Sequence, residues 1–91
     1  MNKESAEKLS ILIMQISSMM NDSVAFVRDN DSEDVFENYH KIAGNIMASL
    51  YLDIEEKLWT KYPELRPTAM DGSYEVDSKI YEPRFYEWND E

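Results

Sequence analysis

The chain has 91 residues, of which 19 are acidic and nine are basic, giving a formal net charge of −10, and it has no cysteine. A chain of this length forms one domain at most. Its charge repels nucleic-acid phosphates and anionic lipid headgroups, and the absence of cysteine excludes a disulfide scaffold or a thiolate metal site. No apolar run approaches the roughly 18 residues of a membrane span. We therefore expect a cytoplasmic protein that binds neither nucleic acid nor membranes directly and whose natural partners carry basic surfaces.

Apolar residues recur at three- and four-residue steps through the first third of the chain, which predicts a helix of about 25 residues. Asn21, Asp22 and Ser23 are poor helix formers, but the stripe keeps its phase across them, which favours one continuous helix. We expect the stripe to form the core contact. Its members are Ala6, Leu9, Leu12, Ile13, Ile16, Met20, Val24 and Val27.

The periodicity stops over residues 29–32 and resumes in a second helix of nearly thirty residues that ends before Pro63. Asp31 or Ser32 can cap this helix, and Glu33 and Asp34 face the positive end of its dipole. The two helices predict an all-α hairpin over residues 1–62. The second stripe consists of Val35, Tyr39, Ile42, Ile46, Leu50, Ile54 and Leu58, widened by Phe36, Ala43 and Met47.

Residues 63–91 differ in composition from the hairpin. Three prolines exclude long helices there, and Asp71-Gly72 is a turn signal. Tyr74, Val76 and Ile80 alternate with charged residues, as in a short strand or an extended docked segment. Five of the eleven aromatic residues of the chain lie after residue 73, so we expect this acidic, aromatic tail to pack on the hairpin or on a partner.

Both predicted helices carry apolar or small residues on the side opposite the main stripe. These residues are Ile11 and Met14 on the first helix and Gly44, Ala48, Leu52 and Trp59 on the second. A glycine inside a helix costs about 0.8–1 kcal/mol, so Gly44 suggests a closely approaching neighbour. A second copy of the hairpin, forming a dimeric four-helix arrangement, could cover this side, and so could the tail through Trp88 or Tyr81. We expect both, with these residues and Trp88 at the interface.

No catalytic or cofactor motif is present. Glu37-x-x-His40 has the spacing of a di-iron ligand pair, but His40 lies about 100° and Glu37 about 160° away from the core direction of the helix. No nucleophile has a base beside it, and the two glycines, Gly44 and Gly72, form no phosphate loop. We therefore expect a protein without enzyme activity, metal or cofactor.

The acidic residues permit two interpretations. Five of them lie at the hairpin turn, namely Asp29, Asp31, Glu33, Asp34 and Glu37. A solvated surface that keeps a dimer soluble explains them, which leads to our first hypothesis, a non-catalytic adaptor or regulator that acts as a homodimer. The alternative is an acidic inhibitor that imitates nucleic acid and occupies the groove of a basic nucleic-acid-binding protein.

Four short segments between residues 26 and 67 carry a resemblance. They read Phe26-Val27-Arg28, Tyr39-x-x-Ile42-Ala43-Gly44-x-Ile46-Met47, Tyr51-Leu52-Asp53-Ile54 and Tyr62-Pro63-Glu64-Leu65-Arg66-Pro67. Together they resemble a group of small, uncharacterised bacterial proteins with no assigned activity. The resemblance implies a bacterial, cytosolic, helical protein and carries no functional residues across.

Overall fold

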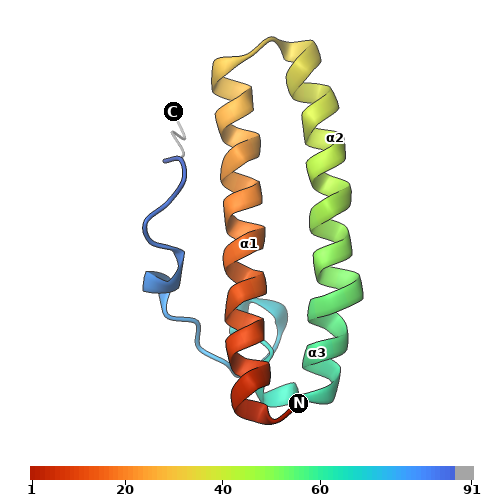
Figure 1. The fold of residues 1–91 in the computed structure, drawn as a ribbon, viewed down its shortest axis with the longest axis vertical. Helices are drawn as coiled ribbons and strands as arrows, with labels where there is room; N and C mark the ends of the chain where they lie inside the picture. Colours follow the sequence, from red (N-terminus) through yellow and green to blue (C-terminus); the bar gives the residue numbers. More distant parts are fainter. Residues whose placement is uncertain (88–91) are drawn as a thin grey trace.

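A computed structural model describes residues 1–87 of the chain. Helix α1 runs from Lys3 to Asn30, and after a short turn α2 runs from Glu33 to Ser49. The helical backbone then continues through a π-helical segment, η1 (Leu50–Glu55), into α3 (Glu56–Lys61). We call α2, η1 and α3 together the second rod. It lies beside α1, which confirms the all-α hairpin (Figure 1).

The ends of the two long helices follow from their capping residues. The Asn2 side chain accepts a hydrogen bond of 2.8 Å from the Ser5 backbone N–H at the start of α1. At the turn, Ser32 rather than Asp31 caps α2, because its hydroxyl accepts the Val35 N–H at 3.3 Å. Helix α1 passes unbroken through residues 21–23, since the polar side chains there do not interrupt its backbone hydrogen bonds.

The π-helical segment changes which side of the second rod faces the core. The Glu56 N–H donates to the Tyr51 carbonyl, five residues earlier, so this turn holds one more residue than an α-helical turn. In a regular α-helix Ala43 and Trp59 would point about 160° apart, yet both are buried. Accommodating one extra residue reduces that difference to about 60°, which brings Trp59 round to the hairpin interior.

The tail, residues 63–87 of the described chain, contains three short 3₁₀ turns: η2 (Pro63–Leu65), η3 (Thr68–Met70) and η4 (Ser78–Tyr81). The predicted strand is an extended segment with a single parallel bridge between Pro67 and Tyr74, and the described residues contain no strand longer than this bridge. Gly72 lies in the turn that connects the two bridged residues, Pro67 and Tyr74. A Cβ atom at this glycine would stand 1.9 Å from the Arg66 carbonyl oxygen, so no larger residue fits without backbone movement.

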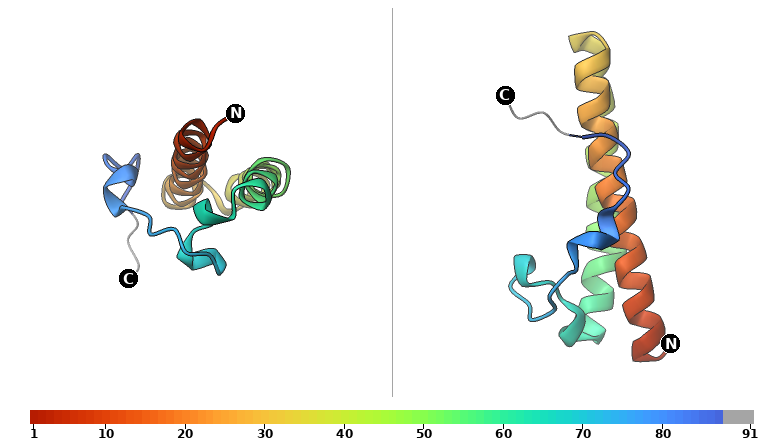
Figure 2. Two further views of the ribbon diagram at one scale, coloured as in Figure 1. Left: turned by 90° about the horizontal axis from the view of Figure 1, so that it is seen from below. Right: turned by 90° about the vertical axis from the view of Figure 1, so that its left-hand side faces the viewer.

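The tail covers one side of the hairpin and leaves the other side open (Figure 2). On the covered side, the core cluster consists of Ala6, Met14, Trp59 and Leu65. The partly buried side chains packed against it include Ile11, Tyr51, Tyr74, Val76, Ile80 and Tyr81. From the sequence we expect both a second copy and the tail to cover the side with Ile11 and Met14; in the described chain, tail residues pack against this cluster.

Much of the expected core stripe is instead exposed to solvent. In α1, Leu12 and Ile16 are exposed, and in the second rod Val35, Ile42 and Ile46 are exposed. The prediction that the stripes form the core is therefore wrong for these residues, although it is right for Ala6, Ile13, Val24 and Ala43. The physical reason is that the neighbouring helix covers only the part of each stripe nearest to it, and the tail reaches only the edge of the stripe of α1, beside Leu12 and Ile16.

Helix α1 also has an 18-residue window with a mean hydropathy of 1.2, so by length and composition it could span a membrane. The core helix of a soluble protein meets the same criterion. In this structure α1 packs along both the second rod and the tail, and it buries the charged side chain of Asp22.

Candidate functional site

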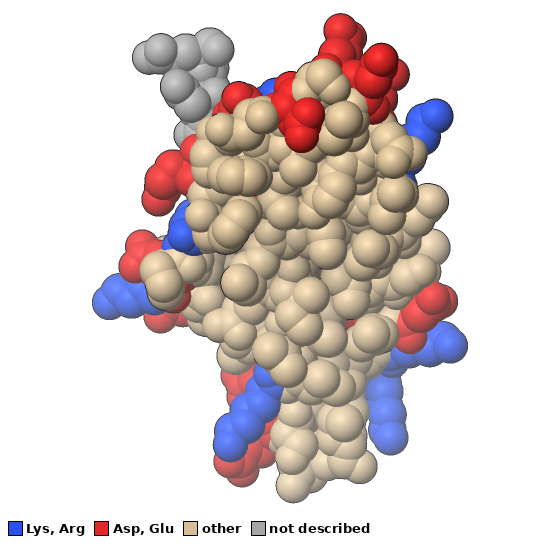
Figure 3. Space-filling model, turned by 45° about the horizontal axis from the view of Figure 1, so that its top comes forward, with Lys and Arg blue, Asp and Glu red and all other residues tan. Residues whose placement is uncertain are grey.

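The exposed apolar residues of the two stripes form the first candidate site, which we call the open face. Its members are Leu12, Ile16, Val35, Ile42, Ile46 and Ile54, and the most exposed of them, Ile42, leaves 50% of its surface in solvent. Figure 3 shows a broad surface over the hairpin without Lys, Arg, Asp or Glu, with charged side chains gathered at its borders. Several large apolar side chains left exposed on a small protein are typical of a binding surface.

The acidic residues of the turn lie beyond one end of the open face. Asp29 accepts hydrogen bonds from Arg28, at 2.9 Å, and from the Tyr86 hydroxyl, at 2.6 Å. Both bonds favour the ionised carboxylate and hold the pKa of Asp29 below its ordinary value, the Arg28 bond having the larger effect. Asp31, Glu33 and Asp34 are exposed to solvent, so the turn presents a concentrated negative charge.

A line of polar residues along α1 binds the tail. The Tyr74 hydroxyl donates to Glu7 at 2.7 Å, the Gln15 amide donates to the Ile80 carbonyl at 2.8 Å, and Arg84 donates to Asp22. The Tyr86 contact with Asp29 continues the series. The α1 residues are spaced by seven or eight positions and therefore share one side of the helix. We call them the docking line: Glu7, Gln15, Asp22 and Asp29.

The sequence analysis did not predict the docking line, although the heptad spacing of its polar residues is visible in the sequence. Polar residues at heptad spacing on the side opposite an apolar stripe would normally be read as a solvated surface. Here Asp22 is only 1% exposed, which no surface reading of the sequence predicts. The tail runs along α1 in the same direction, so successive tail residues meet successive members of the line (Figure 2).

The residues expected at an interface separate into two groups. Met14 and Trp59 are part of the core, being 7% and 2% exposed, and Ile11 packs partly buried beside them. These three are therefore not available to an external partner. The Trp59 indole N–H donates to the Ser10 hydroxyl at 2.9 Å, which satisfies its one polar atom.

The remaining predicted interface residues are not covered by the tail. Leu52 is 57% exposed, so neither Tyr81 nor another described tail residue covers it, and Ala48 is exposed as well. Apart from its own stretch of helix, nothing lies within 4 Å of the position that a Cβ of Gly44 would take, so the close neighbour inferred from this glycine is not part of the described chain. Trp88 lies outside the described residues.

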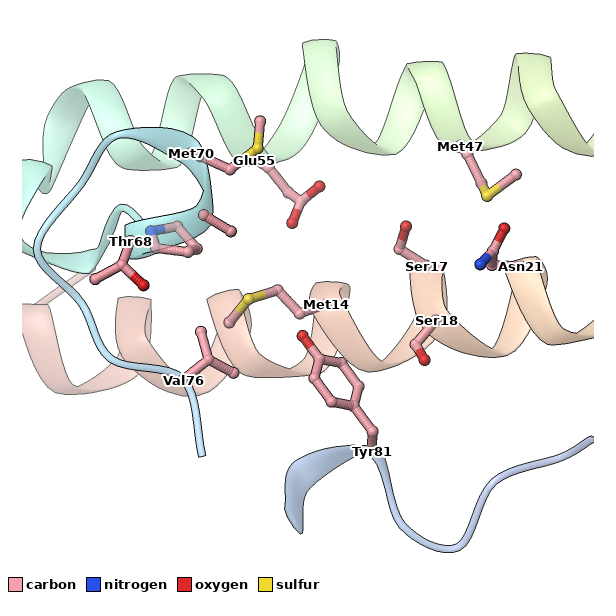
Figure 4. Close-up of a pocket in the computed structure, with 12 residues that line it drawn as sticks. Met14, Ser17, Ser18, Asn21, Met47, Glu55, Thr68, Met70, Val76 and Tyr81 are labelled. Atoms are coloured by element: carbon pink, nitrogen blue, oxygen red, sulfur yellow. The ribbon is translucent and has the colours of Figure 1, made fainter. Parts of the chain in front are cut away.

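The second candidate site is a pocket of about 480 Å³ between α1, the second rod and the tail (Figure 4). Met14, Ser17, Asn21, Met47, Glu55 and Tyr81 are among its lining residues. In Figure 4 the Glu55 carboxylate points from the second rod into the pocket, and Ser17 points across from α1. Burial raises the pKa of Glu55 above its ordinary value, because removing water disfavours the charged form.

Glu55→Gln is expected to stabilise the protein at neutral pH, by on the order of 1 kcal/mol, because it removes a charge that burial disfavours. The raised pKa means that the stability contributed by Glu55 is fully present below the ordinary glutamate pKa and is lost as the pH rises through the folded-state pKa. The gain should therefore be largest at pH 7–8 and vanish near about pH 4, as urea unfolding across this range can test.

Asp53→Asn is the matched control, since it removes the same charge from an exposed position two residues earlier. An equal gain in both variants would show that relief of the overall negative charge, rather than burial of Glu55, stabilises the protein.

The sole histidine and the acidic residues are the candidate metal ligands in this chain. Within residues 1–87 no group of three acidic or histidine side chains lies close enough to hold a metal ion. His40 stacks on Phe36 at a ring distance of 5.5 Å, and both His40 and Glu37 lie on the exposed side of the helix.

Comparison with protein-family models, curated proteins and solved structures finds no match to this chain. The resemblance to small bacterial helical proteins therefore stays a prediction.

Proposed function

We propose that the protein is a non-catalytic interaction module, a small acidic adaptor or regulator, which acts as a homodimer joined through the open face. The observation that carries this proposal is the row of large apolar side chains left exposed along both helices of the hairpin. The tail packs on another side of the hairpin: it reaches the edge of the open face beside Leu12 and Ile16 but leaves both exposed.

The dimensions of the open face support a second copy of the chain as its occupant. A helix of 28 residues is about 42 Å long, and two adjacent helices are about 20 Å wide, so the hairpin offers on the order of 800 Å². Stable protein interfaces bury about 800 Å² on each partner. Two hairpins packed through these faces would form the four-helix arrangement expected from the sequence.

The charge distribution favours an antiparallel arrangement of the two copies. A parallel dimer would place the two acidic turns side by side, and unscreened like charges across an interface are unfavourable. An antiparallel dimer separates them by about the length of the hairpin.

The charge distribution gives less support to nucleic-acid mimicry. Duplex DNA carries a negative charge every 1.7 Å or so along its axis, whereas the face in Figure 3 has its carboxylates at the borders.

Light scattering after size exclusion tests the proposal. We expect the wild-type protein to be a dimer at micromolar concentration and Ile46→Asp to weaken the dimer by at least about 100-fold, because the new carboxylate would be buried without a partner. Leu52→Asp places the same charge at a more exposed apolar position outside the open face, and it should remain dimeric.

A wild-type monomer at every concentration would contradict self-association. Dissociation by Leu52→Asp but not by Ile46→Asp would instead assign the interface to the side carrying Ala48 and Leu52. Circular dichroism of each variant establishes that the helices are intact when the mass is measured.

A further inference from the structure

The Glu55 side chain is a buried acid for which the described chain provides no partner. The residue is 7% exposed, and its carboxylate forms no hydrogen bond or ion pair within residues 1–87; its oxygens are not sealed inside the protein but open into the adjoining pocket. Other buried polar groups of the protein do have partners: Asp22 is bound by Arg84, and the Trp59 indole by Ser10. Buried carboxylates are usually paired or hydrogen-bonded, because an isolated one is costly. Glu55 therefore retains an unmet capacity to accept hydrogen bonds.

This carboxylate borders a space that can hold a ligand. At about 480 Å³, the pocket lies within the range of small-molecule sites. Its walls come from three parts of the chain: Ser17 and Asn21 from α1, Met47 and Glu55 from the second rod, and Tyr81 from the tail. Figure 4 shows the Glu55 carboxylate pointing into this space.

The chemistry of the walls selects a positively charged ligand. No lysine, arginine or histidine is among the lining residues, so the pocket offers one carboxylate and no opposing cation. The Ser17 hydroxyl and the Asn21 carbonyl can accept further N–H bonds. The thioethers of Met14 and Met47 and the ring of Tyr81 provide polarisable surface for an alkyl chain or a cation. The net charge of −10 raises the local concentration of cations around the protein.

We propose that this pocket binds a small primary amine, with Glu55 accepting hydrogen bonds from its ammonium group and the methionine and tyrosine side chains contacting its alkyl chain. The site is independent of the open face, since none of the lining residues belongs to that face. Loss of self-association would leave this proposal unaffected.

The test uses the methyl resonances of Met14 and Met47 in protein labelled at methionine, titrated with n-butylamine and with putrescine at pH 8. Both methyl groups should shift with saturable curves, because both side chains line the pocket. Uncharged n-butanol, which has a similar shape, should bind at least about tenfold more weakly, since it cannot form a charge-assisted bond to Glu55.

Glu55→Gln should weaken binding of both amines by at least about tenfold, whereas Asp53→Asn, with the same loss of charge outside this pocket, should leave it unchanged. The affinity should also fall as the pH is lowered and Glu55 is protonated. Tyr81 is the other titratable residue of the lining, and it stays neutral in this range.

Three results would overturn the proposal. These are the absence of methyl shifts with either amine, equal affinity for n-butanol and n-butylamine, and equal affinity of the wild-type and Glu55→Gln proteins. Because Glu55→Gln removes a buried charge and should remain folded, lost binding in that variant reports on the site rather than on the fold.

Discussion

Trp59→Ala is expected to lower the free energy of unfolding by about 3–5 kcal/mol, the usual loss for truncating a buried tryptophan. The indole is 2% exposed, contacts Tyr51 at a ring distance of 6.5 Å, and lies beneath the Arg66 guanidinium at 5.7 Å. Arg66 is itself held by a two-bond contact with Glu56, at 2.8 and 3.1 Å. One side chain thus joins α1, α3 and the start of the tail.

The expected loss is large relative to the stability available. A chain of 91 residues has a total stability of about 5–14 kcal/mol, so urea unfolding of Trp59→Ala should show a clearly lower midpoint. Leu52→Ala, an exposed apolar truncation on the same rod, is the matched control and should cost less than about 1 kcal/mol. Comparable losses in the two variants would contradict the central position of Trp59.

Trp59→Phe separates packing from hydrogen bonding. It keeps an aromatic ring but leaves the Ser10 hydroxyl without its donor, so a smaller loss of about 1–3 kcal/mol is expected. Adding Ser10→Ala should then cost little more, because the unpaired hydroxyl is removed.

Arg84→Met should measurably destabilise the protein, by removing the guanidinium bound to the buried carboxylate of Asp22. Breaking a fully buried ion pair costs about 3–5 kcal/mol. We expect less here, since 35% of the Arg84 side chain is exposed to solvent while Asp22 is buried. Methionine retains most of the length of the side chain, so the change reports mainly on charge and hydrogen bonding.

Two further variants identify the source of this effect. Asp22→Asn combined with Arg84→Met should cost less than the sum of the two single changes, which a double-mutant cycle measures by urea unfolding. Arg28→Met removes a cation from the more exposed pair with Asp29 and should cost less stability than Arg84→Met. Additive losses for Asp22 and Arg84 would mean that this contact does not hold the tail in place.

The elements of the fold could be predicted from sequence, because they depend on local periodicity and capping. The spacing from Leu9 to Val27 indicates a helix whatever packs against it, and Ser32 caps the next helix through its own hydroxyl. Pro63 likewise fixes the end of the second rod at Lys61.

The buried side of each helix could not be predicted in the same way. Leu12 and Met14 are both apolar, and the choice between them depends on where the tail runs, which is a contact between residues more than sixty positions apart. Trp59 was assigned to the wrong side of its helix because a constant 100° per residue was assumed across the π-helical segment. For Glu55 the sequence offers no signal, since an acid at this position looks like an ordinary surface residue until the tail closes over it.

Because of the π-helical turn, the fold depends on the number of residues between Ala43 and Trp59 as well as on which residues they are. Deleting one residue from Leu50–Glu55 would allow regular α-helical hydrogen bonding, yet it would swing the indole about 100° out of the core. A buried tryptophan contributes more than one irregular turn costs, so packing prevails over backbone regularity. Natural variation at these six positions should therefore consist of substitutions, while changes of length are confined to the connections outside the rods.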